Sequence, residues 1–153
     1  MKTIAALTNG IRQFLADVES GRITQGCFTL NEKDIIALNT EKQLFTEGKN
    51  ALGVSIASYE PYSDVTLTIK AQKGQPTDRV TLRDTQAFHN SFFIFADNKA
   101  AYFKATDKKA QKLYDRYGQI FGLTNESKNI VIWEMLYPML MAELKSHLLW
   151  QSQ

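Results

Sequence analysis

The stretch FFIFADNKAAYFKA, residues 92–105, is the part of the sequence that decides the fold class. Two apolar segments, Phe92 to Ala96 and Ala100 to Ala105, flank the turn-forming residues Asp97-Asn98-Lys99, and this pattern predicts a hairpin. Phe92 to Phe95 are apolar without alternation, and a strand of that kind has to be covered on both faces. Helices of the same domain would cover one face. Either a neighbouring subunit or a more fully wrapped monomer would cover the other.

Two further strands are expected upstream of this hairpin. Gly53 to Ser58 and Val65 to Ala71 are rich in β-branched residues, with a break at Pro61 between them. The residues Lys73-Gly74-Gln75-Pro76 predict a turn after the second of these strands. The sheet would therefore contain about four strands within residues 53–105.

Helices are predicted on both sides of the sheet region. An apolar stripe at three- and four-residue spacing indicates a helix over about 3–20, ended by Gly21, and its members are Ile4, Leu7, Ile11, Phe14, Leu15 and Val18. Asn31 is a suitable N-cap for a second helix that stops at Gly48, so the N-terminal helices fill about 3–48.

The C-terminal helices are expected within about 107–149. Thr106 or Asp107 caps a short helix that ends at Gly118, and a longer helix runs from about Asn125 to Leu149, with a kink expected at Pro138. We therefore predict one α+β domain over residues 1–153. In it, N-terminal helices, a short helix and a long C-terminal helix pack on a small, mostly antiparallel sheet.

Composition limits the class of protein. The chain has 153 residues, 44% of them hydrophobic, which is typical of one globular domain. Lys and Arg number 18 and Asp and Glu number 16, so the formal net charge of +2 is too small to indicate nucleic-acid binding by itself. The single cysteine, Cys27, fits a reducing compartment. The N-terminus lacks the pattern of a signal peptide, and the apolar stretch Ile130 to Leu149 is interrupted by charged residues, so no membrane contact is expected.

The sequence offers no cluster that predicts catalysis. His89 and His147 lie in different elements, and the pattern places no second metal ligand beside either, so both are expected to be hydrogen-bonded structural histidines. Cys27 lacks a hydrolase signature and is expected to be a small buried side chain. No nucleophile elbow and no phosphate-binding glycine loop is present. We therefore expect a protein that is not an enzyme and that uses neither a metal nor a cofactor.

Charged side chains suggest a basic face late in the chain. Lys104, Lys108, Lys112 and Arg116 form this basic face. It is interpreted either as a solvated surface or as a patch that contacts an acidic partner or a nucleic acid, and nucleic-acid binding is the alternative function. Residues 31–47 carry an excess of acidic side chains, so copies arranged head-to-tail would pair surfaces of opposite sign, as in a ring.

Two segments resemble a known family. The segment VTLRDTQAFHNS, residues 80–91, is similar to the L-x-D-T-G-x-L/F-x-x-S element of phage virion-morphogenesis proteins, with Gln86 where the family pattern has glycine. Residues 107–123 resemble the D-x-K … L … Y-G … I-F-G-L ending of versions from phages of Bacteroidetes-type hosts. The matching residues are Leu82, Asp84, Thr85, Phe88, Ser91, Asp107, Lys109, Leu113, Tyr117, Gly118, Ile120, Phe121, Gly122 and Leu123.

The resemblance implies a role in particle assembly. Such proteins complete the tail or join head and tail, so this chain is expected at the head–tail junction or tail terminus of a phage or prophage virion. It would be made in the host cytoplasm and would bind copies of itself and connector or tail-tube proteins. From the residues themselves, we expect Asp84 and Thr85 to close a turn through backbone N–H groups, and Tyr117 and Phe121 to anchor a loop to the core. With Gln86 in place of the family's glycine, the turn is expected either to have an ordinary backbone conformation or to be strained.

Overall fold

The computed structural model describes residues 3–149, which form two compact units. Unit 1 contains residues 3–31, 96–101 and 129–149, and unit 2 contains residues 32–95 and 102–128. Among the described residues, no helix is both long and apolar enough to cross a membrane.

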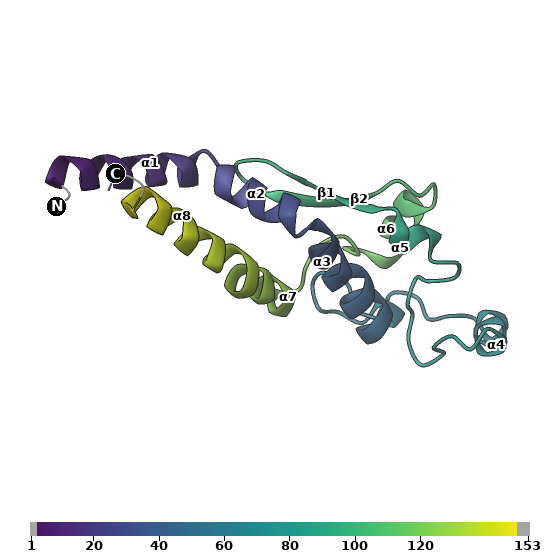
Figure 1. Ribbon diagram of the computed structural model, residues 1–153. Coiled ribbons are helices and arrows are strands. Elements are labelled where there is room, and N and C mark those ends of the chain that lie inside the picture. The colour runs from purple at the N-terminus through teal and green to yellow at the C-terminus, as the bar shows by residue number, and fades with distance from the viewer. Residues whose placement is uncertain (1–2, 150–153) are drawn as a thin grey trace. The chain divides into compact units, whose positions relative to one another are not determined.

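Unit 1 is built from helices. They are α1 (Ile4–Glu19), α2 (Arg22–Leu30), the π-helical segment η3 (Val131–Leu136) and α8 (Tyr137–Leu149). Figure 1 shows α1 and α8 running side by side. They approach closely at Gly10, where an added Cβ would lie 2.6 Å from the His147 carbonyl oxygen. Gly10 therefore weakens the helix locally but permits this packing.

The predicted N-terminal helix is confirmed, but its apolar stripe is largely exposed. Ile4 is 85% exposed, Ile11 46% and Leu15 50%, and Leu7 and Val18 are also exposed. The side of α1 that packs on α8 carries Gly10 and one member of the stripe, the half-buried Phe14, whose ring contacts His147. The periodicity identified the helix correctly, while the stripe does not mark the helix's buried side.

Unit 2 contains the larger hydrophobic core. Its elements are α3 (Glu32–Ala37), the π-helix η1 (Leu38–Glu47), the 3-10 turn η2 (Ile56–Ser58), α4 (Asp64–Gln72), α5 (Ala87–Asn90), β1 (Phe92–Ala96), β2 (Ala101–Ala105), α6 (Ala110–Tyr117) and the start of α7 (Asn125–Ile130). The core residues come from most of these elements and are Leu44, Ile56, Val80, Leu82, Phe88, Phe92, Ala110, Tyr117 and Ile120. The Phe88 and Phe92 rings meet edge to face with centroids 5.1 Å apart.

The expected hairpin is present as β1 and β2, but the sheet has two strands among the described residues and not about four. Residues 65–71, predicted as a strand, lie in α4. Ser63 caps this helix by accepting a hydrogen bond from the Thr66 N–H, and the Thr68 hydroxyl donates to the Asp64 carbonyl. These local bonds override the weak β preference of the branched side chains. Residues 53–58 form a loop and the short turn η2.

The helix predicted for Asn125 to Leu149 consists of α7, η3 and α8 in succession. Pro138 lacks an N–H, and its ring would crowd the carbonyl of Glu134 in a regular α-helix. Glu134 lies in the π-helical segment η3, which ends at Leu136, two residues before Pro138. A π-helical turn of this kind is a common way for a helix to accommodate the distortion that a proline causes. Residues 22–30, which lie between the two predicted N-terminal helices, form a further helix, α2.

Two buried amide side chains of η1 hold a loop 80 residues further along the chain. The Asn39 Nδ2 donates to the Ile120 carbonyl at 3.1 Å, and the Gly122 N–H donates to Asn39 Oδ1 at 3.2 Å. The Gln43 Nε2 donates to the Gly122 carbonyl, and the Thr124 N–H donates to Gln43 Oε1, both at 2.9 Å. Both amides are fully buried. We call these four hydrogen bonds the amide clamp, because they bind alternate residues as a partner strand would.

Replacing Gln43 by leucine tests the amide clamp. Leucine has a similar volume but leaves the part-buried Gly122 carbonyl and the buried Thr124 N–H without their partners, so Gln43→Leu should lower the free energy of unfolding by about 2–4 kcal/mol. Urea denaturation measures the loss. The exposed Gln72, in α4, provides the matched control, because Gln72→Leu should change stability by less than about 0.5 kcal/mol. Equal effects of the two variants would contradict a role for the clamp.

Candidate functional site

Eight of the fourteen residues on which the predicted family resemblance rests line one cavity in unit 2. Its volume is about 510 Å³, and we call it the motif cavity. Eight of its lining residues belong to the matching positions, namely Leu82, Asp84, Thr85, Phe88, Asp107, Lys109, Leu113 and Tyr117. The others are Tyr62, Thr66, Ile69, Lys70, Lys73, Arg83 and Ala87. The two sequence segments therefore contribute to one concave surface.

Backbone conformation shapes the turn at the edge of this cavity. Leu82 has φ +52° and Gln86 has φ +67°, both in the left-handed region. Asp84 was expected to accept backbone N–H groups; in the structure its carboxylate pairs with the Lys73 ammonium at 2.5 Å. The Gln75 side chain donates to the Asp84 carbonyl, and Lys70 donates to the Arg83 carbonyl. Lysine and glutamine side chains from the α4 region thus hold the turn's carbonyl groups.

Gln86 occupies the strained form of the turn, which is one of the two alternatives that the sequence left open. Glutamine in the left-handed region costs about 1–2 kcal/mol, whereas glycine adopts it freely at some cost in unfolded-state entropy. The side chain of Gln86 is exposed, so its removal disturbs no core packing.

Glycine at position 86 should therefore stabilise the chain. Gln86→Gly is expected to raise the free energy of unfolding by about 0.5–1 kcal/mol, measured by urea denaturation. Gln86→Ala shortens the side chain without relieving the strain and should give no such gain. A destabilising glycine variant would show that the positive φ is not a source of strain.

Lys70 is a buried cation in the wall of the motif cavity. Its side chain, in α4, is 6% exposed. The ammonium donates to the Arg83 carbonyl at 2.7 Å and to Gln75 Oε1 at 2.9 Å, and it lies 4.8 Å from the centre of the Tyr62 ring. Lysine is rarely buried without a charged partner, yet both of these acceptors are neutral.

The remaining charges of the motif cavity are partly paired. The hydrogen bond from Lys73 holds the pKa of Asp84 below its usual value. Arg83 pairs with Glu41, outside the cavity lining, and its guanidinium lies 4.0 Å from the centre of the Phe45 ring. Asp107 accepts a hydrogen bond from the backbone N–H of Lys109 at 2.7 Å, just before α6 begins.

His89 is a buried structural histidine, as expected. It is 3% exposed, and its Nε2 lies 3.0 Å from the Thr81 carbonyl, an acceptor that requires Nε2 to carry a proton. Burial, followed by the charge of Arg83, lowers the pKa of His89 to about 4, with Lys70 acting in the same direction and Glu41 in the opposite one. His89 is therefore neutral near neutral pH.

This lowered pKa predicts that stability falls in mild acid. The unfolded chain takes up a proton at His89 near pH 6.5, whereas the folded chain does so only near pH 4. Stability is therefore fully present above about pH 6.5, and about 2 kcal/mol should be lost between about pH 7 and about pH 5. His89→Gln retains an N–H donor for Thr81 and should reduce this loss, as measured by urea denaturation at the two pH values. An unchanged loss would contradict the assignment.

The other matching residues shape the connections of unit 2. Ser91 donates its hydroxyl to the Phe88 carbonyl, and its own carbonyl accepts from the Thr106 N–H at the open end of the hairpin. Tyr117 and Phe121 anchor the loop to the core, as expected. The loop residues held at the amide clamp or beside it are Gly118, Ile120, Phe121, Gly122 and Leu123.

The basic face is weaker than the sequence suggested. Arg116 forms a bidentate ion pair with Glu60, and the Glu60 carboxylate offsets the charge of Arg116. Lys104 lies in β2, Lys108 precedes α6, and Lys112 lies in α6, all three exposed. These three lysines form the rest of the predicted basic face, so the observations favour nucleic-acid binding less than the sequence did.

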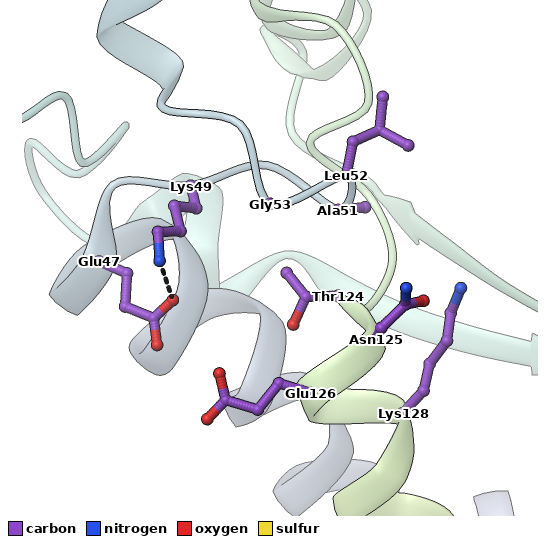
Figure 2. Close-up of a pocket in the computed structure, with 9 residues that line it drawn as sticks. All are labelled: Glu47, Lys49, Ala51, Leu52, Gly53, Thr124, Asn125, Glu126 and Lys128. Atoms are coloured by element: carbon purple, nitrogen blue, oxygen red, sulfur yellow. Dashed lines mark ion pairs between the residues drawn. The ribbon is translucent and has the colours of Figure 1, made fainter.

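A second, more polar cavity of about 350 Å³ lies between the loop after η1 and the start of α7. Figure 2 shows its lining residues, which are Glu47, Lys49, Ala51, Leu52, Gly53, Thr124, Asn125, Glu126 and Lys128. Lys49 pairs with Glu47 at 3.5 Å, and Lys42 bridges Glu47 and Glu126. These pairs satisfy the acidic side chains of the cavity, so it has the character of a structural junction.

In unit 1 the prediction that no second ligand-type residue lies beside His147 was wrong. His147, Glu143 and Asp17 place ligand-type atoms within 4.8 Å of one another, and Glu143 lies four residues before His147 on α8. Arg22 binds Asp17 at 2.8 Å and Glu143 at 3.1 Å, and the His147 Nε2 lies 2.9 Å from Asp17. Arg22 holds the pKa of Asp17 at about 2. The Arg22 guanidinium thus lies where a metal ion would bind these carboxylates, and the cluster links α1 with α8.

Within the described residues, no pair of side chains has the arrangement of an activated nucleophile. Cys27 is fully buried, as expected, and burial raises the pKa of its thiol, which disfavours the reactive thiolate. The motif cavity combines apolar walls with cations, an arrangement suited to binding. Compared with family models, curated proteins and solved structures, the chain matches none.

Sequence reasoning missed the most unusual residues of unit 2. Lys70 lay in a segment predicted to be a strand, and a lysine on the solvent-facing side of a strand is common. Asn39 and Gln43 continue the four-residue spacing that begins at the buried Ile35. Polar amides on the buried side of a helix are the signal that predicts partners for them inside the fold.

Proposed function

We propose that this chain is a structural protein of a phage or prophage particle, placed at the head–tail junction or the tail terminus. It acts by self-assembly and by contacts with other virion proteins, such as connector or tail-tube proteins. The resemblance of residues 80–91 and 107–123 to virion-morphogenesis proteins supports the type of particle.

The observation that carries the assembly role is the exposed stripe of α1, formed by Ile4, Leu7, Ile11, Leu15 and Val18. The stripe follows the three- and four-residue spacing of one helix face, so it extends over about 21 Å at about 1.5 Å per residue. Contiguous apolar surface on a soluble chain marks sites of protein contact. This face is suited to packing against a second helix.

The hairpin in unit 2 has an apolar surface of its own. Phe93 is 37% exposed and Phe95 57%, and the Phe95 ring stacks on Tyr102 with centroids 6.2 Å apart. Of the two alternatives left open by the sequence, cover by a neighbouring subunit agrees better with this exposure. A chain with two different contact surfaces is able to bind two neighbours, as subunits of a ring do.

Charge contributes less to this proposal than the sequence suggested. Glu41 pairs with Arg83, and Glu47 pairs with Lys42, so these acidic residues have partners within their own unit. Surface ion pairs between copies would add little to affinity. Apolar contact is the better-supported basis for assembly.

A charge placed in the α1 stripe tests the proposal. Sedimentation analysis of the full chain should show concentration-dependent assembly, and Leu15→Glu should weaken the association at least tenfold, because a carboxylate is costly to bury in an apolar interface. Asn9→Glu adds the same charge to an exposed position of the same helix and should leave assembly unchanged.

Two results would contradict the proposal. One is a chain that stays monomeric at the highest attainable concentration and does not co-purify with connector or tail-tube proteins. The other is assembly that Leu15→Glu and Asn9→Glu disturb equally, because the stripe would then not be the contact surface.

A further inference from the structure

The motif cavity has an apolar wall large enough for side chains of a partner. The wall combines aliphatic and aromatic residues from α4, the turn, α5 and α6, among them Ile69, Leu82, Phe88, Leu113 and Tyr117. Its volume of about 510 Å³ falls within the range of about 300–1,000 Å³ typical of binding pockets. The wall therefore favours an apolar ligand group.

The charges of the lining favour an anion. Its titratable groups include four cations, Lys70, Lys73, Arg83 and Lys109, against two carboxylates, Asp84 and Asp107, a difference of +2. Lys73 is paired with Asp84, and Arg83 is paired with Glu41. Lys70 and Lys109 remain as the cations available to a ligand, against the single charge of Asp107, whose carboxylate accepts a backbone N–H of the turn before α6.

Lys70 supplies the specific binding group. Its ammonium has three N–H donors, and the neutral oxygens of Arg83 and Gln75 accept two of them. The side chain is only 6% exposed, so its charge is poorly solvated. A ligand carboxylate at the third donor would satisfy both the donor and the charge, and a buried charge-assisted hydrogen bond is among the stronger polar contacts.

From this geometry we infer that the motif cavity binds a peptide segment of a partner protein in which a carboxylate stands next to an apolar side chain. Lys70 receives the carboxylate, the exposed Lys109 attracts it at the rim, and the apolar wall receives the neighbouring side chain. The inference rests on the proposed assembly role, for which it names the chemistry of one contact. Charge complementarity selects the acidic segment, and the apolar wall selects against a bare phosphate.

The inference is tested by titrating the full chain with a defined peptide. Acetyl-Leu-Phe-Glu-amide is the probe, acetyl-Leu-Phe-Gln-amide is its neutral match, and 4-phenylbutyrate represents a free carboxylate. Binding is followed by the amide chemical shifts of the ¹⁵N-labelled protein. The acidic peptide should shift the signals of the cavity lining and bind at least tenfold more tightly than either of the other two probes.

Three variants identify the binding groups. Lys70→Met keeps the aliphatic stem and should weaken the acidic peptide at least tenfold, while Lys112→Met, on the exposed side of α6, should leave its affinity unchanged within twofold. If Lys70→Met fails to fold, Lys109→Glu at the exposed rim replaces it and should weaken binding at least threefold.

Equal binding of the acidic and neutral peptides, shifts outside the cavity, or no binding by any probe would overturn the inference. Binding of 4-phenylbutyrate as tight as that of the peptide would overturn the assignment to a partner segment. The two proposals fail separately: peptide binding by a chain that never assembles contradicts only the assembly role, whereas assembly without peptide binding contradicts only this inference.

Discussion

Unit 2 depends on the hydrogen bonds that the buried amides of Asn39 and Gln43 make with the loop Ile120–Thr124. The sheet is too small to hold this segment as a strand, so side chains take the place of a neighbouring backbone. Each amide carries a donor and an acceptor, which match the alternating carbonyl and N–H groups of the loop. The fixed loop then presents Ile120 to the core and places Phe121 against Phe92, with ring centroids 5.2 Å apart. The aromatic core and the amide clamp therefore support each other.

The same use of polar side chains recurs at the motif cavity. The Tyr62 hydroxyl accepts the N–H groups of Thr81 and Leu82, Lys70 donates to the next carbonyl along the turn, and His89 binds the Thr81 carbonyl. The turn adopts left-handed conformations without glycine because these contacts determine it from several sides. A rigid turn beside an open cavity is a suitable frame for recognition, and the Lys70 ammonium that stabilises this turn is also the group to which we assign ligand binding.

The surfaces of the chain complement this picture. A protein that acts by assembly requires apolar faces that remain exposed in the single chain, and the α1 stripe and the outer face of the hairpin have this property. Most of the strong charge pairs instead lie within one unit, as between Arg116 and Glu60 or Arg22 and Asp17. Charge thus mainly serves the fold, and apolar surface is the part of the chain that the proposed assembly role uses.

The sequence by itself determined the helix of residues 4–19, the hairpin, and the helices that follow it, because periodicity, turn residues and glycine stops are local signals. It also predicted a buried Cys27 and a hydrogen-bonded His89, and both features are present. It did not determine α4. The branched residues of this segment favour a strand, but Ser63 and Asp64 begin a helix there. Only the tertiary structure decided which stripe of α1 is covered, how Asn39 and Gln43 find partners 80 residues away, and that Lys70 joins the motif residues around one cavity. These features depend on contacts between distant segments, and neither spacing nor composition encodes which distant groups will meet.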